Sequence, residues 1–148
     1  MTLRDFLSQT LGVWDGIYTH LSPDGEVVER FPSRQELRLD GTRWYERIVY
    51  RPGSAEESVN DFRGELDASG QLQLGMAGFT GRAVLIDHRT LFFTGEWHES
   101  GIRVNELVTL TGEHAKVRLW QRFHGSELVG CSIIRETRRV GAVPAQWH

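Results

Sequence analysis

The chain has 148 residues, of which 39% are hydrophobic and 25% charged, and its formal net charge at pH 7 is −3. This size and composition are typical of one globular domain with a sizeable core, and the acidic balance argues against the basic surface on which nucleic-acid binding depends. No apolar run approaches the roughly 18 residues that a membrane-spanning helix requires. We therefore expect neither nucleic acid nor a membrane as a partner.

The N-terminus and the cysteine content favour a cytoplasmic protein. The segment Met1–Asp5 lacks the basic start and the apolar stretch of a secretory signal. The single cysteine, Cys131, cannot form an intramolecular disulfide, which agrees with a reducing compartment. Its apolar, strand-like neighbourhood contains no cation nearby in sequence, so we expect an inert thiol and not a nucleophile.

The first ten residues carry the best helix signal in the chain. Thr2 and Asp5 form a weak capping box, and Leu3, Phe6 and Leu7 fall on one side at helical spacing. We expect a short amphipathic helix that packs the N-terminus against the fold; a position across one end of a barrel is the alternative role.

From Leu11 onward the hydrophobic period changes to two, which predicts strands. Turn residues such as those in Ser22–Gly25 and Arg51–Ser54 separate most of them. The expected strands are residues 12–20, 26–31, 33–39, 43–51, 58–66, 71–76, 82–87, 90–98, 103–110, 115–124 and 127–136. Short strands at this spacing, without a second helix, are typical of an antiparallel meander, and closing the meander removes its exposed edges.

We therefore predict a single all-β domain over residues 1–140, an antiparallel up-and-down barrel of eight to eleven strands with a short N-terminal helix. A two-sheet sandwich is the alternative. Residues 141–148 lack periodicity and are predicted to form a C-terminal tail, with Trp147 as a candidate anchor against the barrel.

Alternation along each strand assigns side chains to the inner or outer face. Strand 43–51 carries three arginines at its odd positions, which turns its even positions inward. In strand 115–124 the same argument places Lys116, Arg118 and Arg122 outside. The polar and aromatic residues that these patterns turn inward are Gln35, Trp44, Glu46, Tyr50, Glu106, Gln121 and Phe123.

Two strands allow either assignment. Strand 12–20 turns inward either Trp14, Gly16, Tyr18 and His20 or Val13 and Ile17, and we favour the first set. Strand 90–98 presents either Phe93 and Trp97 or Phe92, Glu96 and His98.

The predicted interior is thus of mixed polarity. An ionised carboxylate buried without a partner is costly, so such an interior is more favourable as a cavity holding water or a ligand than as a solid core. Trp44, Tyr50 and Phe123 would supply aromatic walls, and Gln35 and Gln121 polar contacts, to a ligand.

The segment Leu11–Gly16 resembles the Gly-X-Trp signature of the calycin superfamily, which includes lipocalins and fatty-acid-binding proteins. The longer stretch Gly12–Arg51 resembles a family of small bacterial calycin-like proteins of unassigned function, and this resemblance extends to Arg139. It implies a barrel with a ligand pocket and an arginine on the last strand packed over the tryptophan, for which Arg135 is the matching position. Relatives in the superfamily bind lipids, haem or pigments, and some barrels of this size act as cyclases or isomerases.

General acid–base chemistry is the enzymatic reaction that the inward-facing residues favour. Burial raises the pKa of a carboxyl group, so Glu46 and Glu106 could exchange protons near neutral pH. Tyr18 and His20 could donate hydrogen bonds to a carbonyl or an oxyanion. The alternative is that both carboxyls are solvated at the mouth or paired with arginines.

No cofactor and no metal ion is expected. The six histidines show neither H-x-H nor H-E-x-x-H spacing. A haem held by His98 or His124 is the alternative.

The leading interpretation is a barrel that binds a small aromatic or lipid-like molecule, as a cofactor-free cyclase, isomerase or dehydratase. A non-catalytic carrier or sensor, including a haem carrier, is the alternative, and the sequence leaves a homodimer open.

Overall fold

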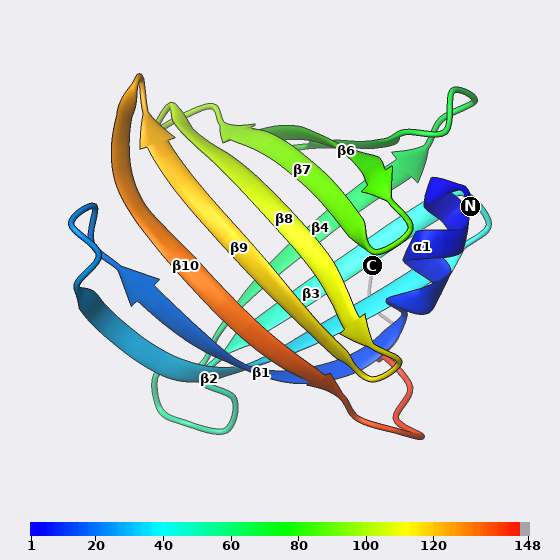
Figure 1. The fold of residues 1–148 in the computed structure, drawn as a ribbon, viewed down its shortest axis with the longest axis horizontal. Coiled ribbons are helices and arrows are strands. Elements are labelled where there is room, and N and C mark those ends of the chain that lie inside the picture. Colours follow the sequence, from blue (N-terminus) through cyan, green and yellow to red (C-terminus); the bar gives the residue numbers. More distant parts are fainter. Residues whose placement is uncertain (146–148) are drawn as a thin grey trace.

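The computed structural model describes residues 1–145, which form a closed antiparallel barrel of ten strands with one short helix (Figure 1). The strands follow one another around the barrel in chain order, and β10 closes it against β1. This confirms the predicted fold class and excludes the sandwich. The elements are α1 (Leu3–Gln9), β1 (Gly12–Leu21), β2 (Val27–Asp40), β3 (Arg43–Tyr50), β4 (Ser58–Leu66), β5 (Leu72–Met76), β6 (Phe79–Asp87), β7 (Thr90–Trp97), β8 (Ile102–Gly112), β9 (Ala115–His124) and β10 (Glu127–Arg138).

The predicted strands 26–31 and 33–39 are one strand, β2, which continues through Pro32 opposite Ile17 of β1. The Pro32 carbonyl accepts a hydrogen bond from the Arg51 N–H at 2.9 Å, just beyond the end of β3. Because the N–H and C=O of one strand residue point to the same side, the missing N–H of Pro32 also faces that side and the ladder with β1 stays intact.

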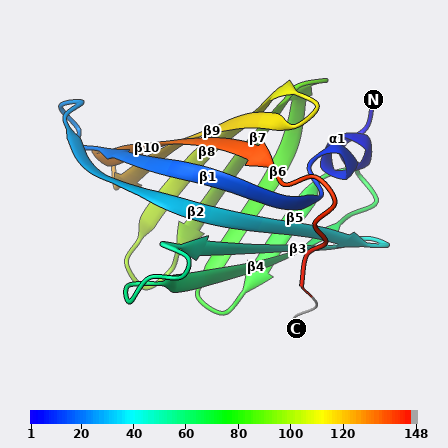
Figure 2. The ribbon, with the colours of Figure 1, turned by 90° about the horizontal axis from the view of Figure 1, so that it is seen from below.

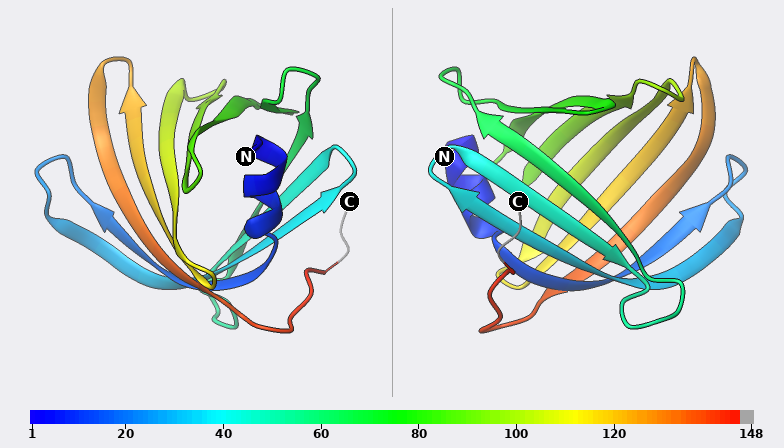
Figure 3. Two further views of the ribbon diagram at one scale, coloured as in Figure 1. Left: turned by 45° about the vertical axis from the view of Figure 1, so that its right-hand side comes forward. Right: turned by 180° about the vertical axis from the view of Figure 1, so that it is seen from behind.

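Helix α1 lies across one end of the barrel (Figure 3, left). Its capping box is complete, since Thr2 Oγ1 accepts from the Asp5 N–H at 3.2 Å and the Asp5 carboxylate accepts from the Thr2 N–H at 2.8 Å. Leu3, Phe6 and Leu7 are buried against the barrel. Within the described residues, this seven-residue helix is too short to cross a membrane.

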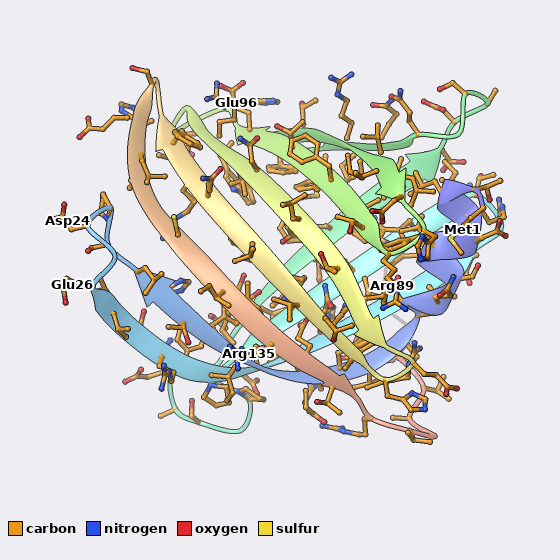
Figure 4. All side chains as sticks on the ribbon, viewed as in Figure 1. Met1, Asp24, Glu26, Arg89, Glu96 and Arg135 are labelled. Carbon is orange, nitrogen blue, oxygen red and sulfur yellow. The ribbon has the colours of Figure 1, made fainter. Side chains whose placement is uncertain are left out.

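The tryptophan of the Gly-X-Trp motif is in contact with two cations. The Arg138 guanidinium is 4.5 Å from the Trp14 ring centroid and the Lys116 ammonium is 4.4 Å from it. Arg138 also donates to the carbonyl of Leu11. The expectation that Arg135 packs over this ring is wrong: Arg135 pairs with Ile17 and is exposed on the outer face of β10 (Figure 4). Arg138, three residues later, has that role.

The structure resolves the two ambiguous strands. On β1, Trp14 and Tyr18 are fully buried inside while Ile17 is 45% exposed, so the favoured assignment is confirmed. On β7, Phe93 and Trp97 line the interior.

The predicted orientation of β9 is wrong. Lys116 and Arg118 are each 1% exposed inside the barrel, whereas Leu119 is 45% exposed outside. A regular two-residue hairpin after β8 would pair Glu106 with Gln121, but an extra residue between Leu110 and Gly112 shifts the register and pairs Glu106 with Trp120. A one-residue slip turns every side chain of a strand to the opposite face.

The segment after β10 crosses the outside of β2 (Figure 2). The Arg139 N–H donates to the Val13 carbonyl at 2.7 Å, and the Ala145 N–H donates to the Glu36 carboxylate at 2.9 Å. Glu36 therefore faces the outside of β2 and is nevertheless buried. The predicted anchor Trp147 lies outside the described residues.

Candidate functional site

The barrel contains a cavity that extends from α1 to the far end of β3 and β4. The space between its lining side chains is about 880 Å³ when the open mouth is included. The part in which the centre of a water molecule fits is about 120 Å³. Most of the lining is aromatic or aliphatic. The polar lining residues are Thr10, Gln35, Glu46, Tyr50, Asn60, Glu106, Lys116 and Arg118.

The structure brings five of the nine predicted site residues together around this cavity; they are Gln35, Trp44, Glu46, Tyr50 and Glu106. Gln121 and Phe123 are not in the lining, because the shifted register turns both to the outside of β9. Gln121 is exposed there, and the Arg103 guanidinium lies 5.4 Å from the Phe123 ring centroid. These two residues are therefore withdrawn as contacts to a ligand in the barrel.

Tyr18 and His20 point inward but lie behind the lining. The Tyr18 hydroxyl accepts a hydrogen bond from Arg118 Nη2 at 2.9 Å, and burial raises the pKa of Tyr18 well above its usual value. The His20 ring bonds to the hydroxyl of Ser132, and burial, with the charge of Arg122, lowers the pKa of His20. Neither Tyr18 nor His20 is among the residues that line the cavity.

The centre of the polar network is a buried ion pair between Arg118 and Glu136. Alternation along the sequence did not identify either residue as inward-facing. Arg118 binds Glu136 through two parallel hydrogen bonds, Nε to Oε1 at 2.8 Å and Nη2 to Oε2 at 3.0 Å. Burial raises the pKa of Glu136, but the charges of Arg118 and Lys116 outweigh it and leave that pKa below its usual value. Glu136 is thus an anion inside the barrel.

Gly16 makes room for this anion. Gly16 pairs with Glu136 across β1 and β10, and a Cβ at Gly16 would lie 2.7 Å from the Glu136 Cγ and 3.0 Å from the Ser33 hydroxyl. A glycine in a strand interior often marks such a close approach, and it is the one local signal that could have pointed to Glu136.

Lys116 extends the network toward β2. Its ammonium is 3.5 Å from Glu136 Oε1 and donates a hydrogen bond to Gln35 Oε1, and the Gln35 amide in turn donates to Glu46. Burial lowers the pKa of Lys116 to about 8, against the opposing charge of Glu136.

Glu46 and Glu106 are the two lining carboxyls with raised pKa values. Burial raises the pKa of Glu106 to about 8, although Arg118 Nη1 lies 3.4 Å from its carboxylate. Burial also raises the pKa of Glu46, and the charge of Arg118 and the Gln35 hydrogen bond only partly offset it. Glu106 can therefore hold or release a proton near neutral pH, and the charge of Arg118 favours the ionised form of both carboxyls.

Among the described residues, no cluster of histidine, cysteine or carboxylate side chains has the arrangement of a metal site. His98 bonds to Thr80 on the exposed surface and His124 is exposed at the end of β9. Neither lines the cavity, so the residues that were candidates for a haem axial ligand do not fit a haem inside the barrel.

The family of the chain follows from its sequence. Residues 2–140 match the family model described as "Domain of unknown function (DUF3598), N-terminal". The chain belongs to this family. The match confirms the resemblance of the stretch Gly12–Arg51 to a family of unassigned function, and no curated protein sequence matches the chain.

Two solved structures with the same fold match at least nine tenths of this chain. The S-type phycobiliprotein lyase CPES from Guillardia theta has a TM-score of 0.75 at 11% identity, over 94% of this chain and 93% of that one. A DUF3598-family protein of unknown function from Nostoc punctiforme has a TM-score of 0.73 at 12% identity, over 90% of this chain and 49% of that one. This chain thus spans about half of the second protein. At these identities the likeness concerns the fold alone.

A barrel bound to DFHBI, EF1p2_mFAP2b, is less similar, with a TM-score of 0.52 at 9% identity over 93% of this chain and all of that one.

Proposed function

We propose that the barrel binds a small aromatic or lipid-like molecule in its cavity, and that Glu46 and Glu106 exchange protons with it. The observation that carries this proposal is the pair of carboxyls with raised pKa values in the lining of an otherwise largely apolar cavity.

Two such carboxyls suffice for a cofactor-free reaction. A cyclisation, an isomerisation or a dehydration each needs a proton delivered to one atom of the substrate and removed from another. Protonated Glu106 would be a general acid at neutral pH and becomes a base once it ionises, and Glu46 would exchange the second proton. Arg118 lies beside Glu106 and stabilises the anion that forms when Glu106 gives up its proton.

The comparisons support the binding part of this proposal. One barrel of the same fold is a lyase named for phycobiliproteins, and another is bound to the small molecule DFHBI. They do not select a reaction.

A non-catalytic carrier is the second candidate, and the partners of the two carboxyls favour it. Glu46 accepts a hydrogen bond from Gln35, and Glu106 lies beside Arg118. Carboxyls that already have partners within the protein can serve as structural charges. A carrier would bind its ligand and release it unchanged.

Binding is tested with N-phenyl-1-naphthylamine, a dye that fluoresces in apolar surroundings. We expect saturable binding of one dye per chain. The variant Ala83→Phe, which fills the cavity, should abolish binding, and the control Ala55→Phe on an exposed loop should not. Equal binding by both variants would place the dye elsewhere and contradict the proposal.

Proton transfer is tested with 5-nitrobenzisoxazole, whose ring opens when a base removes its C3 proton. We expect a rate that rises with pH as Glu106 ionises, with a midpoint near its pKa of about 8. The variants Glu106→Gln and Glu46→Gln should lower that rate while N-phenyl-1-naphthylamine still binds. If neither substitution changes the rate, the acid–base proposal fails and the carrier remains.

A further inference from the structure

Arg122 is an inward-facing arginine without an acidic partner. The side chains that β9 turns inward are Lys116, Arg118, Trp120 and Arg122, and the first three line the cavity. Arg118 is paired with Glu136, whereas Arg122 forms no ion pair in the part of the chain that the structure describes. A partly buried guanidinium with no carboxylate beside it can bind the anionic group of a ligand.

Arg122 lies next to the cavity, toward the end of the barrel opposite α1. It pairs with Val104 of β8, a buried residue of the cavity lining. Paired residues on one face of a sheet have Cβ atoms about 4.5–5.5 Å apart. Helix α1 covers the other end, and the β9–β10 hairpin that follows Arg122 points away from it (Figure 3, left). A ligand in the cavity therefore reaches Arg122 by extending one residue step along β9 toward the uncovered end.

Most donors of the Arg122 guanidinium are unused and accessible. Arg122 Nη1 donates to the Ser132 hydroxyl at 3.1 Å, and Nε and Nη2 have no partner among the described residues. Neither atom is one of the buried unpaired atoms, so water reaches both of them although Arg122 is only partly exposed. Gly130 provides the space for this guanidinium, because a Cβ at Gly130 would lie 2.9 Å from Nη2.

Ser132 orients a second donor beside Arg122. The Ser132 side chain is fully buried, and its hydroxyl contacts both Arg122 Nη1 and His20 Nδ1. An arginine can only donate, so the Ser132 oxygen accepts from Arg122 and its single proton is donated to His20 Nδ1. The proton of neutral His20 is then on Nε2, which has no partner among the described residues and is not buried. His20 Nε2 is therefore a free donor near the free donors of Arg122.

We propose that Arg122 and His20 bind the carboxylate of an amphipathic ligand whose apolar body occupies the cavity. A carboxylate only accepts hydrogen bonds, and its single negative charge matches the single unpaired cation. This inference rests on the proposed binding function and narrows its ligand class to carboxylic acids with an aromatic or aliphatic body. Arg122 is then the residue that selects such acids over neutral molecules of the same shape.

Decanoate and decanamide test this on the full chain, since they have the same length and differ in charge. Each is titrated against bound N-phenyl-1-naphthylamine, and decanoate should bind about 10-fold more tightly because its hydrogen bonds involve charged groups. Arg122→Gln, whose amide can still donate to Ser132, should remove this preference and leave decanamide binding unchanged. Arg30→Gln is the matched control, because exposed Arg30 also donates to a hydroxyl, that of Thr19 at 3.2 Å, but on the outer face of the barrel.

His20 gives a second measurement that needs no variant. Burial and the charge of Arg122 lower the pKa of His20, and the paired side chains Glu29 and Arg51 act on it in opposite directions. A carboxylate bound beside His20 should raise that pKa, and decanamide should not. Titration of the His20 Cε1 proton by ¹H NMR follows the change.

The outcomes separate this inference from the binding function. If decanoate binds no more tightly than decanamide, or keeps its preference in Arg122→Gln, the inference is wrong, while saturable dye binding still supports the binding function. An unchanged pKa of His20 in the decanoate complex would likewise place the carboxylate elsewhere. If neither N-phenyl-1-naphthylamine nor decanoate binds, the binding function itself fails.

Discussion

The Glu136 carboxylate is fully buried beside Arg118 and Lys116, so it neutralises cations that water cannot reach. Ion pairs of this kind contribute little net stability compared with apolar packing, but removing one partner leaves an uncompensated buried charge. The stability of the folded barrel therefore depends on Glu136 more than on any surface carboxylate.

We predict that Glu136→Gln lowers the free energy of unfolding by about 3–5 kcal/mol, because Arg118 and Lys116 lose their shared anion. Urea unfolding followed by circular dichroism measures this change. Glu113→Gln is the matched control, since the Glu113 side chain is 88% exposed and its carboxylate lies 3.7 Å from the ring of the surface residue His114. Equal stability of the two variants would show that the buried pair is energetically unimportant.

Gly16 gives an independent test of the same packing. Gly16→Ala should place a Cβ against Glu136 and Ser33 and destabilise the protein by about 1–3 kcal/mol through overpacking. Gly75→Ala, on an exposed strand position with nothing within 4 Å of the new Cβ, should leave stability nearly unchanged. The comparison is again by urea unfolding, and a harmless Gly16→Ala would argue that Glu136 can move aside.

At the scale of elements, the period of hydrophobic residues and the turn chemistry were enough to predict the helix, the strands and the closed barrel. Alternation also placed Trp44, Glu46 and Glu106 correctly on the inner face. The pairing of β3 with β2 and of β8 with β7 contains no register shift, so inward and outward positions alternate without interruption. These strands have one face that is clearly more polar than the other.

The same reasoning failed on β9 for a definite physical reason. The register shifts once between Leu110 and Gly112 at the start of β9 and again between Leu128 and Gly130 at its end. Each shift moves the pairing by one residue. The hydrophobic pattern of β9 points the wrong way, because Leu119 lies on the outer face and the cations Lys116 and Arg118 lie inside. Lys116 and Arg118 consequently looked like surface residues, and Glu136 had no recognisable partner.

Helix α1 makes a separable contribution to the cavity. Phe6 is fully buried and lines the cavity from the α1 end. We predict that Phe6→Ala costs about 3–5 kcal/mol in unfolding free energy and speeds dissociation of N-phenyl-1-naphthylamine, because it opens that end of the barrel. Stopped-flow fluorescence measures the rate. The control is Ser8→Ala on the exposed side of α1, and an unchanged rate in Phe6→Ala would mean that the dye leaves by the other end.

For the whole molecule, the interior charges predict an unusual dependence of stability on pH. Glu106 has a pKa of about 8 in the folded barrel against 4.5 for a free side chain, so the folded state holds more protons over that interval and stability falls as pH rises from 4.5 to 8. The raised pKa of Glu46 acts in the same direction. Each extra proton held by the folded state changes the unfolding free energy by about 1.4 kcal/mol per pH unit.

Lys116 reverses the slope at higher pH. Its pKa of about 8 in the folded state lies below the 10.5 of a free lysine, so the unfolded chain holds the extra proton and stability rises above pH 8. The two effects together predict a minimum of stability near pH 8, which urea unfolding between pH 4.5 and 10 would reveal.

Substitutions then assign the two slopes. Glu106→Gln should flatten the decline below pH 8, and Lys116→Met should remove the rise above it. A profile that rises steadily from pH 4.5 to 8 in the unsubstituted protein would mean that Glu106 is ionised throughout. The cavity would then carry a permanent carboxylate where the proposed chemistry requires a proton donor.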